Sequence, residues 1–535
     1  MFNRSVGVMG GKVERFEAGL KPKEVGVELK PPLEDYVTVD AYPILEPYTY
    51  ILILRHKVTS RIIYRVEEPT LTEEEKEILR EVTEFLTEEM DINPKELKSK
   101  EETKRYLLKK FRQTIKDYKI PVERANLPKI WYYIQRDFIG YGKIDALMRD
   151  QMVEDISCDG VKIPIYVWHR KYESIPTNIV FESEEELDSF VIRLAYLSGR
   201  HISIAQPMLD ATLPDGSRVQ LTLGREVTRR GSTFTIRKFR LDPLTVIDLI
   251  RFKTLTSEVF AYLWYVIENK ASIMVIGGVA AGKTTLLNCL SMFIEPDLKI
   301  VSIEDTAELN LPHENWIPSV TRMGFGVGSE KSSITLFDLL KASLRQRPDY
   351  IIVGEVRGEE AYTLFQAMAT GHLGMATLHA ESIDAAVYRL ESEPMNVPRT
   401  LIAGLDLMLL IRRVEREGEP VRRVIMVSEI VGLDPRSKEI ITNEVYRWDP
   451  KTDTFVYGGR SYLLEKIARR NGLPLENVLR EIGRRREVLD YMARNNIRDY
   501  KSVSTMIKEY YENPEAVYRR IRMGSIERES FKPYP

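Results

Sequence analysis

The sequence is poor in cysteine and in histidine. Of its 535 residues, two are cysteines, Cys158 and Cys289, and six are histidines. The two cysteines lie far apart and in no Cys-x-x-Cys spacing, which argues against a disulfide framework and against a cysteine-based zinc site. A reducing compartment fits this usage.

Long hydrophobic runs are also missing. A membrane-spanning helix needs about 18 or more consecutive apolar residues, and the best runs here, 50–54 and 405–411, have the length of a strand or a short helix. The N-terminus lacks the apolar segment of a signal peptide. We therefore expect a cytoplasmic chain, peripheral at the inner face of the cell membrane, whose membrane contact is indirect or superficial.

No strong charge imbalance marks the chain as a whole. Its formal net charge is −2, which excludes a globally basic nucleic-acid coat. Negative charge is in excess within residues 1–100, and positive charge is in excess within residues 461–535, where arginines cluster at 484–486 and 519–522. These clusters are either solvated helix faces or an electrostatic handle for an acidic partner or anionic lipid.

What the sequence does contain is folded, mixed α and β structure with 43% hydrophobic residues. A Gly-, Lys- and Glu-rich start suggests a mobile arm, and strand-like pieces then precede a helix that a Thr72–Glu75 capping box opens. Further on, strands alternate with helices, which predicts an α/β domain with a mostly parallel sheet. The boundaries we expect are a mobile arm at 1–30, a strand and helix region at 31–140, a smaller domain at 141–242, an α/β domain at 243–435 and a mainly helical extension at 436–535.

A phosphate-binding loop follows the apolar strand 272–276. The pattern Gly-x-x-x-x-Gly-Lys-Thr is formed by Gly277, Gly278, Val279, Ala280, Ala281, Gly282, Lys283 and Thr284, and a helix continues from Thr285. The glycines permit backbone turns that a side chain would block, so that N–H groups and the helix N-terminus face the phosphates. Lys283 adds a positive charge to the β- and γ-phosphates, and the Thr284 hydroxyl can hold Mg²⁺.

Two more apolar strands end in carboxylates. The strand within 347–357 ends in Gly354-Glu355, with glycine where a metal-binding aspartate is usual, and Glu355 can align the attacking water in phosphoryl transfer. The strand at 301–303 is followed by Glu304, Asp305 and Glu308. Beside a phosphate loop, these can contribute outer-sphere contacts to Mg²⁺ or a second water-positioning group.

Two of the scarce histidines, His372 and His379, flank a short strand. No further ligands with zinc spacing accompany them. His379 is interpreted as a sensor of the γ-phosphate or a link to a neighbouring subunit, although a histidine at a strand end is often structural.

Together these segments resemble the type II/type IV secretion ATPases, the motors of pili, secretion systems and the archaellum (the archaeal flagellum). Four motifs carry the resemblance: a Walker A loop at 277–284, an Asp box at 304–308, a Gly-Glu Walker B strand at 347–357 and a His box at 371–380. The resemblance covers residues 140–435. It implies an α/β fold, with a RecA-like P-loop motor domain, a smaller α+β PAS-like domain before it, and an additional N-terminal α/β region.

The resemblance implies ATP and Mg²⁺ as ligands. Lys283 and Thr284 would bind them, Glu355 would be the catalytic glutamate, Glu308 would assist, and His379 would couple the site to a ring. Thr284, Glu304, Glu308 and Glu355 are the candidate residues around the metal.

In the smaller domain, the segments 214–218 and 235–239 resemble those that supply arginines to the nucleotide. Arg218 and Arg237 are our candidates, because an arginine can neutralise charge on the transferring phosphoryl group. Structural salt bridges are the alternative role for each. The linker near 240–245 would be the hinge between the two domains.

The chain lacks the four-cysteine metal insertion of the bacterial type II enzymes and looks closer to the archaeal branch, through 142–145, 154–157 and 159–160. An archaellum motor ATPase is the first reading, and an archaeal type IV pilus or type II-like secretion ATPase the second. The implied partners are other copies in a hexameric ring, an integral membrane platform protein and accessory motor components, with no nucleic acid. A RecA-like nucleic-acid translocase and a nucleotide-dependent scaffold are the competing hypotheses.

Overall fold

The computed structural model describes residues 34–89, 100–239, 243–322, 333–416 and 418–529. The chain divides into two compact units, Met1–Phe239 and Arg240–Pro535, and each is described by itself. The expected arm at 1–30 and residues 240–242 of the expected hinge lie outside the described residues.

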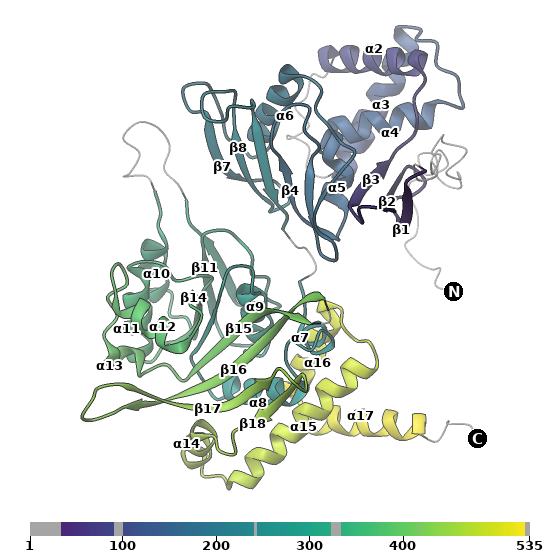
Figure 1. Cartoon of the computed structure of the whole chain (residues 1–535). Helices are drawn as coiled ribbons and strands as arrows, with labels where there is room; N and C mark the ends of the chain where they lie inside the picture. The colour runs from purple at the N-terminus through teal and green to yellow at the C-terminus, as the bar shows by residue number, and fades with distance from the viewer. Residues whose placement is uncertain (1–33, 90–99, 240–242, 323–332, 417, 530–535) are drawn as a thin grey trace. The chain divides into compact units, whose positions relative to one another are not determined.

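The first unit begins with a three-stranded antiparallel sheet followed by helices (Figure 1). Its elements are β1 (Tyr36–Leu45), β2 (Thr49–His56), β3 (Ile62–Glu67), α2 (Glu73–Glu89), α3 (Lys100–Asp117) and α4 (Leu127–Phe138). The capping box forms at the start of α2: the Thr72 amide donates to Glu75 Oε2 at 2.8 Å, and the Glu75 amide donates to Thr72 Oγ1 at 3.2 Å.

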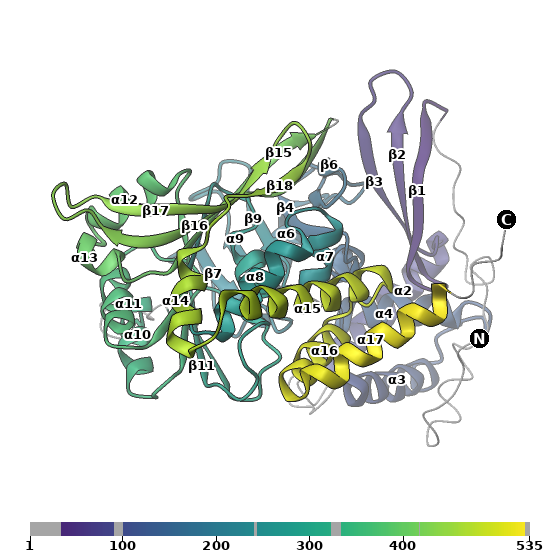
Figure 2. The same ribbon diagram turned by 90° about the horizontal axis from the view of Figure 1, so that it is seen from below.

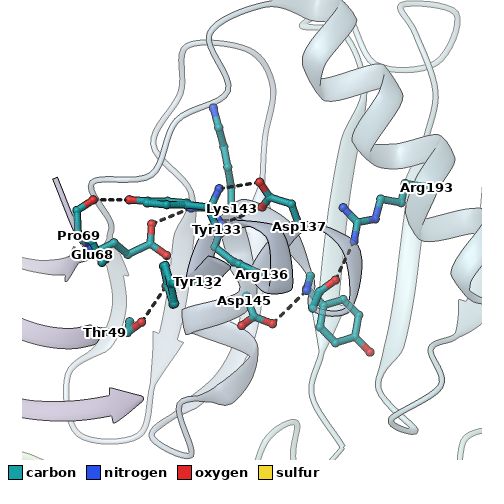
Figure 3. A network of polar contacts seen from close by, with 12 residues as sticks. Thr49, Glu68, Pro69, Tyr132, Tyr133, Arg136, Asp137, Lys143, Asp145 and Arg193 are labelled. Atoms are coloured by element: carbon teal, nitrogen blue, oxygen red, sulfur yellow. Dashed lines mark hydrogen bonds and ion pairs between the residues drawn. The ribbon is translucent and has the colours of Figure 1, made fainter. Parts of the chain in front are cut away.

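Polar side chains fasten α4 to the end of β3 (Figure 3). Glu68 accepts hydrogen bonds from the Tyr132 hydroxyl at 2.6 Å and from Arg136 Nη1 at 2.7 Å. The Tyr133 hydroxyl donates to the Pro69 carbonyl at 2.6 Å. Because the carboxylate pairs with a guanidinium, its partial burial is compensated, and α4 is held in register with the sheet.

The second part of this unit is a six-stranded antiparallel sheet, in the order β6-β5-β4-β9-β8-β7. Its elements are η3 (Gly142–Ile144), α5 (Asp145–Arg149), β4 (Val153–Cys158), β5 (Tyr166–His169), β6 (Glu173–Pro176), α6 (Glu184–Leu197), β7 (Met208–Thr212), β8 (Arg218–Thr222) and β9 (Thr233–Arg237). Gly216, with φ +88°, makes the tight turn between β7 and β8, as the Pro-Asp-Gly sequence predicts.

The second unit is built on a nine-stranded mixed sheet in the order β12-β11-β13-β14-β10-β15-β16-β17-β18. The strands are β10 (Ile273–Gly277), β11 (Ile300–Glu304), β12 (Trp316–Val320), β13 (Tyr350–Val353), β14 (Leu373–His379), β15 (Leu407–Arg416), β16 (Glu419–Leu433), β17 (Ile440–Asp449) and β18 (Thr454–Tyr457). From β12 to β15 neighbouring strands are parallel, and β15 to β18 are antiparallel. The mostly parallel α/β sheet predicted from the sequence is confirmed.

Helices cover both faces of this sheet. The helices are α7 (Val246–Arg251), α8 (Ser257–Glu268), α9 (Lys283–Ser291), α10 (Leu336–Leu344), α11 (Glu360–Ala369), α12 (Ile383–Glu391), α13 (Arg399–Ile402), α14 (Tyr462–Asn471), α15 (Leu475–Arg494), α16 (Tyr500–Glu512) and α17 (Pro514–Glu529). Ile273 and Val275 of β10 pack into one hydrophobic cluster, and Met274 and Ile276 pack into the other. This alternation follows from the two-residue period of a strand that is buried on both sides.

The sheet does not end at residue 435, where the sequence suggested a boundary. β17 and β18 extend it, and α14 to α17 share the hydrophobic cluster that contains α8. Figures 1 and 2 show α15 beside α8. In the part of the chain that the structure describes, none of the helices has both the length and the apolar character to cross a bilayer.

Candidate functional site

Four parallel strands bring the predicted motifs to one edge of the large sheet. β11, β13, β14 and β10 are consecutive neighbours, and Gly277 at the end of β10 pairs in register with His379 at the end of β14. Glu304 ends β11, and Glu355 is the second residue after β13. The carboxyl edge of such a sheet is where α/β proteins place their ligands.

The phosphate loop is packed tightly against β15. A Cβ on Gly277 would lie 2.3 Å from the Ile411 carbonyl oxygen, so only glycine fits there. Gly282 has φ +93° and stands immediately before α9. Lys283 Nζ donates to the Gly278 carbonyl at 2.9 Å, which folds the lysine over the loop.

The remaining loop residues differ in exposure. Val279 is 80% exposed and Ala281 is buried at 2%, whereas Thr284 and Thr285 are half-buried at the start of α9. The loop thus presents its backbone and the Thr284 hydroxyl, with little side-chain bulk above them.

The turn that carries Glu355 is fixed from two sides. The Thr377 hydroxyl on β14 donates to the Gly354 carbonyl at 2.6 Å, and the Val356 amide donates to the Thr377 carbonyl at 2.9 Å. Glu360 Oε1 accepts from the amides of Arg357 and Gly358 at 2.6 and 2.7 Å. The half-buried Glu355 therefore projects from a rigid support.

Arg357 links two of the carboxylates. Its Nη2 donates to Glu355 Oε2 at 2.6 Å, and its Nη1 lies 3.6 Å from Asp305 Oδ2. Burial raises the pKa of Glu355, but the Arg357 hydrogen bond and the charges of Arg357, Lys283 and His379 outweigh it, and the net pKa is lowered. Glu355 is thus an ionised carboxylate near neutral pH.

Glu304 is oriented inward. It is 3% exposed, and its Oε1 accepts the amides of Glu308 and Leu309, each at 3.0 Å. Burial raises its pKa to about 7, opposed by these two hydrogen bonds. Glu304 therefore shapes the Asp-box loop and places Glu308 at its exposed end; direct or outer-sphere metal contact by Glu304 stays a prediction.

The same side chain explains the glycine of the Walker B strand. A Cβ on Gly354 would lie 3.1 Å from Glu304 Cγ and 3.5 Å from Glu304 Oε1. Any side chain at 354 would force Glu304 to move. In this chain, the space beside residue 354 is filled by the neighbouring strand's glutamate.

The charges around the loop influence one another. Burial lowers the pKa of Lys283; Glu355 opposes this shift, and the nearby Arg357 and Arg389 add to it. Arg389 Nη1 donates to the His379 carbonyl at 2.7 Å. Lys283, Glu355, Glu308 and His379 thus belong to one electrostatic neighbourhood, whereas His372 precedes β14 at the opposite edge of the sheet.

The two predicted arginines are direct cross-strand partners. Arg218 on β8 pairs in register with Arg237 on β9, and both are exposed. Their neighbours Val219 and Ile236 are fully buried on the other face. Like charges directly opposite are unfavourable, but Asp155 on β4 is the other cross-strand neighbour of Arg237 and can offset its charge. Both belong to the first unit, and their contact with a nucleotide stays a prediction.

Three residues at the site were missed by the sequence reasoning. Arg357 lies in the Walker B segment, where its position two residues after Glu355 is a usable signal. Arg389 on α12 and Arg422 on β16 carry no sequence signal, because only the fold brings them to the loop. Arg422 Nε donates to the Ala280 carbonyl at 3.2 Å.

The residues present fit a magnesium–nucleotide complex. Across the described ranges, no three His, Cys, Asp or Glu side chains are grouped as a metal site. A P-loop does not require such a group, because phosphate oxygens, water and the Thr284 hydroxyl can supply most ligands of Mg²⁺. The glycine-restricted loop and Lys283 would form the cradle for the phosphates.

Comparison with known proteins gives matches over most of the chain. Residues 141–446 match the family described as Type II/IV secretion system protein, and residues 451–526 match a PilB3-like C-terminal family. An uncharacterised protein of Methanocaldococcus jannaschii is 41% identical over 400 residues, covering 74% of this chain and 72% of that protein.

A probable conjugal transfer protein TrbB of Sinorhizobium fredii is 33% identical over 249 residues, covering 45% of this chain and 73% of that protein. The solved ATPase DotB of Yersinia pseudotuberculosis aligns with 67% of this chain and 90% of its own, at 15% identity and a TM-score of 0.40. The expected fold class, a RecA-like P-loop domain preceded by a smaller α+β domain, is confirmed. With more than half of its length matched, the chain belongs to the type II/IV secretion system protein family.

Proposed function

We propose that this chain hydrolyses ATP and converts the energy into mechanical work on a membrane-anchored machine. The observation that supports this most directly is the convergence of Lys283, Glu355, Glu308 and His379 at the carboxyl edge of the parallel sheet. These residues come from four separate strands and loops, and together they supply a cradle for phosphate and an ionised carboxylate beside it.

Glu355 is the residue that orients the attacking water in this proposal. Phosphoryl transfer needs positioning and charge stabilisation more than covalent chemistry from the protein. The lowered pKa of Glu355 keeps its carboxylate charged, and the bonds around Gly354 keep it in place. Glu308 assists, Lys283 and Thr284 hold the phosphates and Mg²⁺, and Arg218 and Arg237 add positive charge.

The chain acts as a hexameric ring at the cytoplasmic side of a membrane, where it drives assembly or rotation of an archaellum through an integral platform protein. This assignment rests on the family and on the resemblance to its archaeal branch. Accessory motor components complete the machine.

A second candidate, an archaeal type IV pilus assembly or secretion ATPase, is favoured by one observation. Residues 451–526 match the PilB3-like C-terminal family. Deleting the gene in its source organism and imaging the cell surface separates the two candidates. Loss of both archaella and swimming supports the first candidate. Loss of pili in cells that still swim supports the second.

The enzymatic part is tested on the purified full-length chain. Lys283→Ala should abolish binding of Mg·ATP, and Glu355→Gln should bind it normally while hydrolysing about 100-fold more slowly or worse. Glu359→Gln, the same change at an exposed site four residues on, is the matched control and should keep full activity. A fully active Glu355→Gln would sink the catalytic assignment.

The kind of partner is tested by stimulation of the same activity. Vesicles of anionic phospholipid should raise the Mg·ATPase rate, and single-stranded DNA should not. Stimulation by DNA alone would favour the nucleic-acid translocase over the membrane motor.

A further inference from the structure

One residue of the phosphate loop has an unfavourable backbone conformation. Ala280 has φ +55°, in the left-handed region that residues with a side chain seldom adopt. Glycine adopts this region without steric cost, whereas alanine is strained there. Such strain persists only where the surroundings hold it in place.

Arg422 contacts the loop at this point. Its Nε donates a hydrogen bond to the Ala280 carbonyl at 3.2 Å. Its Cδ lies 3.1 Å from where a Cβ on Gly282 would stand, so the arginine stem also packs on the bare backbone of Gly282. The side chain thus contacts the loop at two residues, Ala280 and Gly282.

The sheet brings Arg422 to Ala280 from 142 residues further along the chain. Gly277 pairs with Ile411 on β15, and β15 pairs antiparallel with β16. Arg422 lies on β16 opposite Arg413, two residues beyond Ile411. A residue of β16 can therefore reach across β15 to the loop that follows β10.

We propose that Arg422 is a positioning residue that holds the phosphate-binding loop in its binding conformation by restraining the Ala280 peptide. The inference rests on the proposed binding of ATP by this loop. It deepens that proposal by adding a support outside the four sequence motifs.

The physical argument concerns the peptide that joins Ala280 to Ala281. In a planar trans peptide, the C=O and the N–H point in opposite directions. A hydrogen bond that fixes the Ala280 carbonyl toward Arg422 therefore directs the Ala281 N–H away from Arg422. Backbone N–H groups of this loop are the ones that bind phosphate, so the restraint acts on the ligand through the backbone.

Two substitutions separate the hydrogen bond from the charge. In Arg422→Gln, the side-chain amide nitrogen stands where Nε stood, so the donor is kept and the charge is removed. In Arg422→Met, the stem is kept for packing on Gly282, and both donor and charge are removed. The two variants therefore differ mainly in the donor.

The experiment is isothermal titration of Mg·ADP into the full-length wild type and each variant, with thermal melting as the folding control. Arg422→Met should weaken the affinity about five- to tenfold, the size expected for one hydrogen bond. Arg422→Gln should stay within about twofold of wild type.

A second change tests whether the effect passes through the strained backbone. Ala280→Gly removes the need for an external restraint on the left-handed conformation. In the Arg422→Met background, it should return most of the lost affinity, a recovery that a direct contact between Arg422 and the nucleotide would not give.

The outcomes are distinguishable. If Arg422→Gln is as weak as Arg422→Met, charge is the active element and the positioning role is overturned. The role is also overturned if both variants bind as wild type does, or if Ala280→Gly gives no recovery. If the wild type itself fails to bind Mg·ADP, and Lys283→Ala makes no difference, the proposed function fails with it.

Discussion

Two groups of arginines in the second unit have different kinds of partner. On α15, Arg484 Nη1 lies 2.7 Å from Glu515 Oε1, Arg485 pairs with Glu268, and Arg486 Nη1 lies 3.3 Å from Glu258 Oε2. Around the phosphate loop, Arg357 also pairs with carboxylates, but three other arginines donate to backbone carbonyls: Arg389 to that of His379, Arg412 to that of Glu381, and Arg422 to that of Ala280.

The contrast decides where positive charge is available to a ligand. A carboxylate cancels the charge of its partner, whereas a carbonyl is neutral and only orients the guanidinium. The run 484–486 is strongly basic in sequence, but its ion pairs connect α15 to α8 and α17. The arginines that are dispersed in the sequence but gathered at the loop retain a field suited to an anion. These partners argue against an electrostatic handle at 484–486, but Arg485 is 4% exposed and is therefore not on a solvated helix face either.

The largest effect on stability should come from Arg485→Met. The Arg485 side chain is 4% exposed, pairs with Glu268 and lies against the rings of Trp264 and Tyr510. Removing it leaves a partly buried carboxylate without its cation and should cost about 3 kcal/mol in the free energy of unfolding. Urea denaturation measures this. Nucleotide affinity of the folded fraction should be unchanged, and a loss of affinity instead would break the contrast between the two groups.

Arg357→Met should change the pH dependence of activity, whereas Arg485→Met changes stability. Because Arg357 lowers the pKa of Glu355, its loss should raise that pKa toward the ordinary value. The carboxylate is then protonated at a higher pH, and the acid limb of the profile of kcat/KM against pH should shift upward. An unshifted acid limb would show that Arg357 does not control the ionisation of Glu355.

Glu304→Gln tests a carboxylate that is bound by backbone amides, in contrast to Glu355, which is bound by Arg357. Its pKa of about 7 lies above the ordinary 4.5, so the folded chain keeps a proton that the unfolded chain releases. Stability from this group is present below pH 4.5 and is lost as pH rises through 7. Between pH 5 and pH 8, the urea midpoint should therefore fall less in Glu304→Gln than in the wild type. Equal falls in the two proteins would contradict the raised pKa of Glu304.

The smallest effect should come from Arg486→Gln. Its side chain is 53% exposed, and that of its partner Glu258 is 46% exposed. An exposed pair contributes about 0.5 kcal/mol or less because water screens it. The urea midpoint should move only slightly, and this variant is the matched control for Arg485→Met. A loss of stability as large as that of Arg485→Met would mean that side-chain exposure does not predict the contribution of these ion pairs to stability.

Much of the site could be predicted because its signals are local. A buried strand, a glycine pattern and a following helix define the phosphate loop within fifteen residues, and the apolar strands before Glu304 and Gly354 are equally compact. The Thr72–Glu75 capping box is a local signal of the same kind, and it forms at the start of α2 as predicted.

The antiparallel half of the sheet could not be predicted in the same way. β17 mixes apolar with polar and charged residues without regular alternation, and β18 has four residues that are mostly exposed, so the strand signal of both is weak. In the parallel half, β12 contains Pro318, which lowers its strand signal although an edge position tolerates it. Arg389 and Arg422 reach the loop only through tertiary pairing, for which a single sequence holds no local signature.

The contact between Glu304 and Gly354 makes these two positions one unit for protein engineering. Installing an aspartate at 354, to imitate the usual metal-binding strand end, would collide with Glu304, whereas shortening Glu304 alone would leave the Asp-box loop without its acceptor. The two positions are therefore best varied together. In a library that randomises both codons, side chains at 354 should be enriched in combination with a smaller residue at 304, and a single-site scan would underestimate what position 354 tolerates.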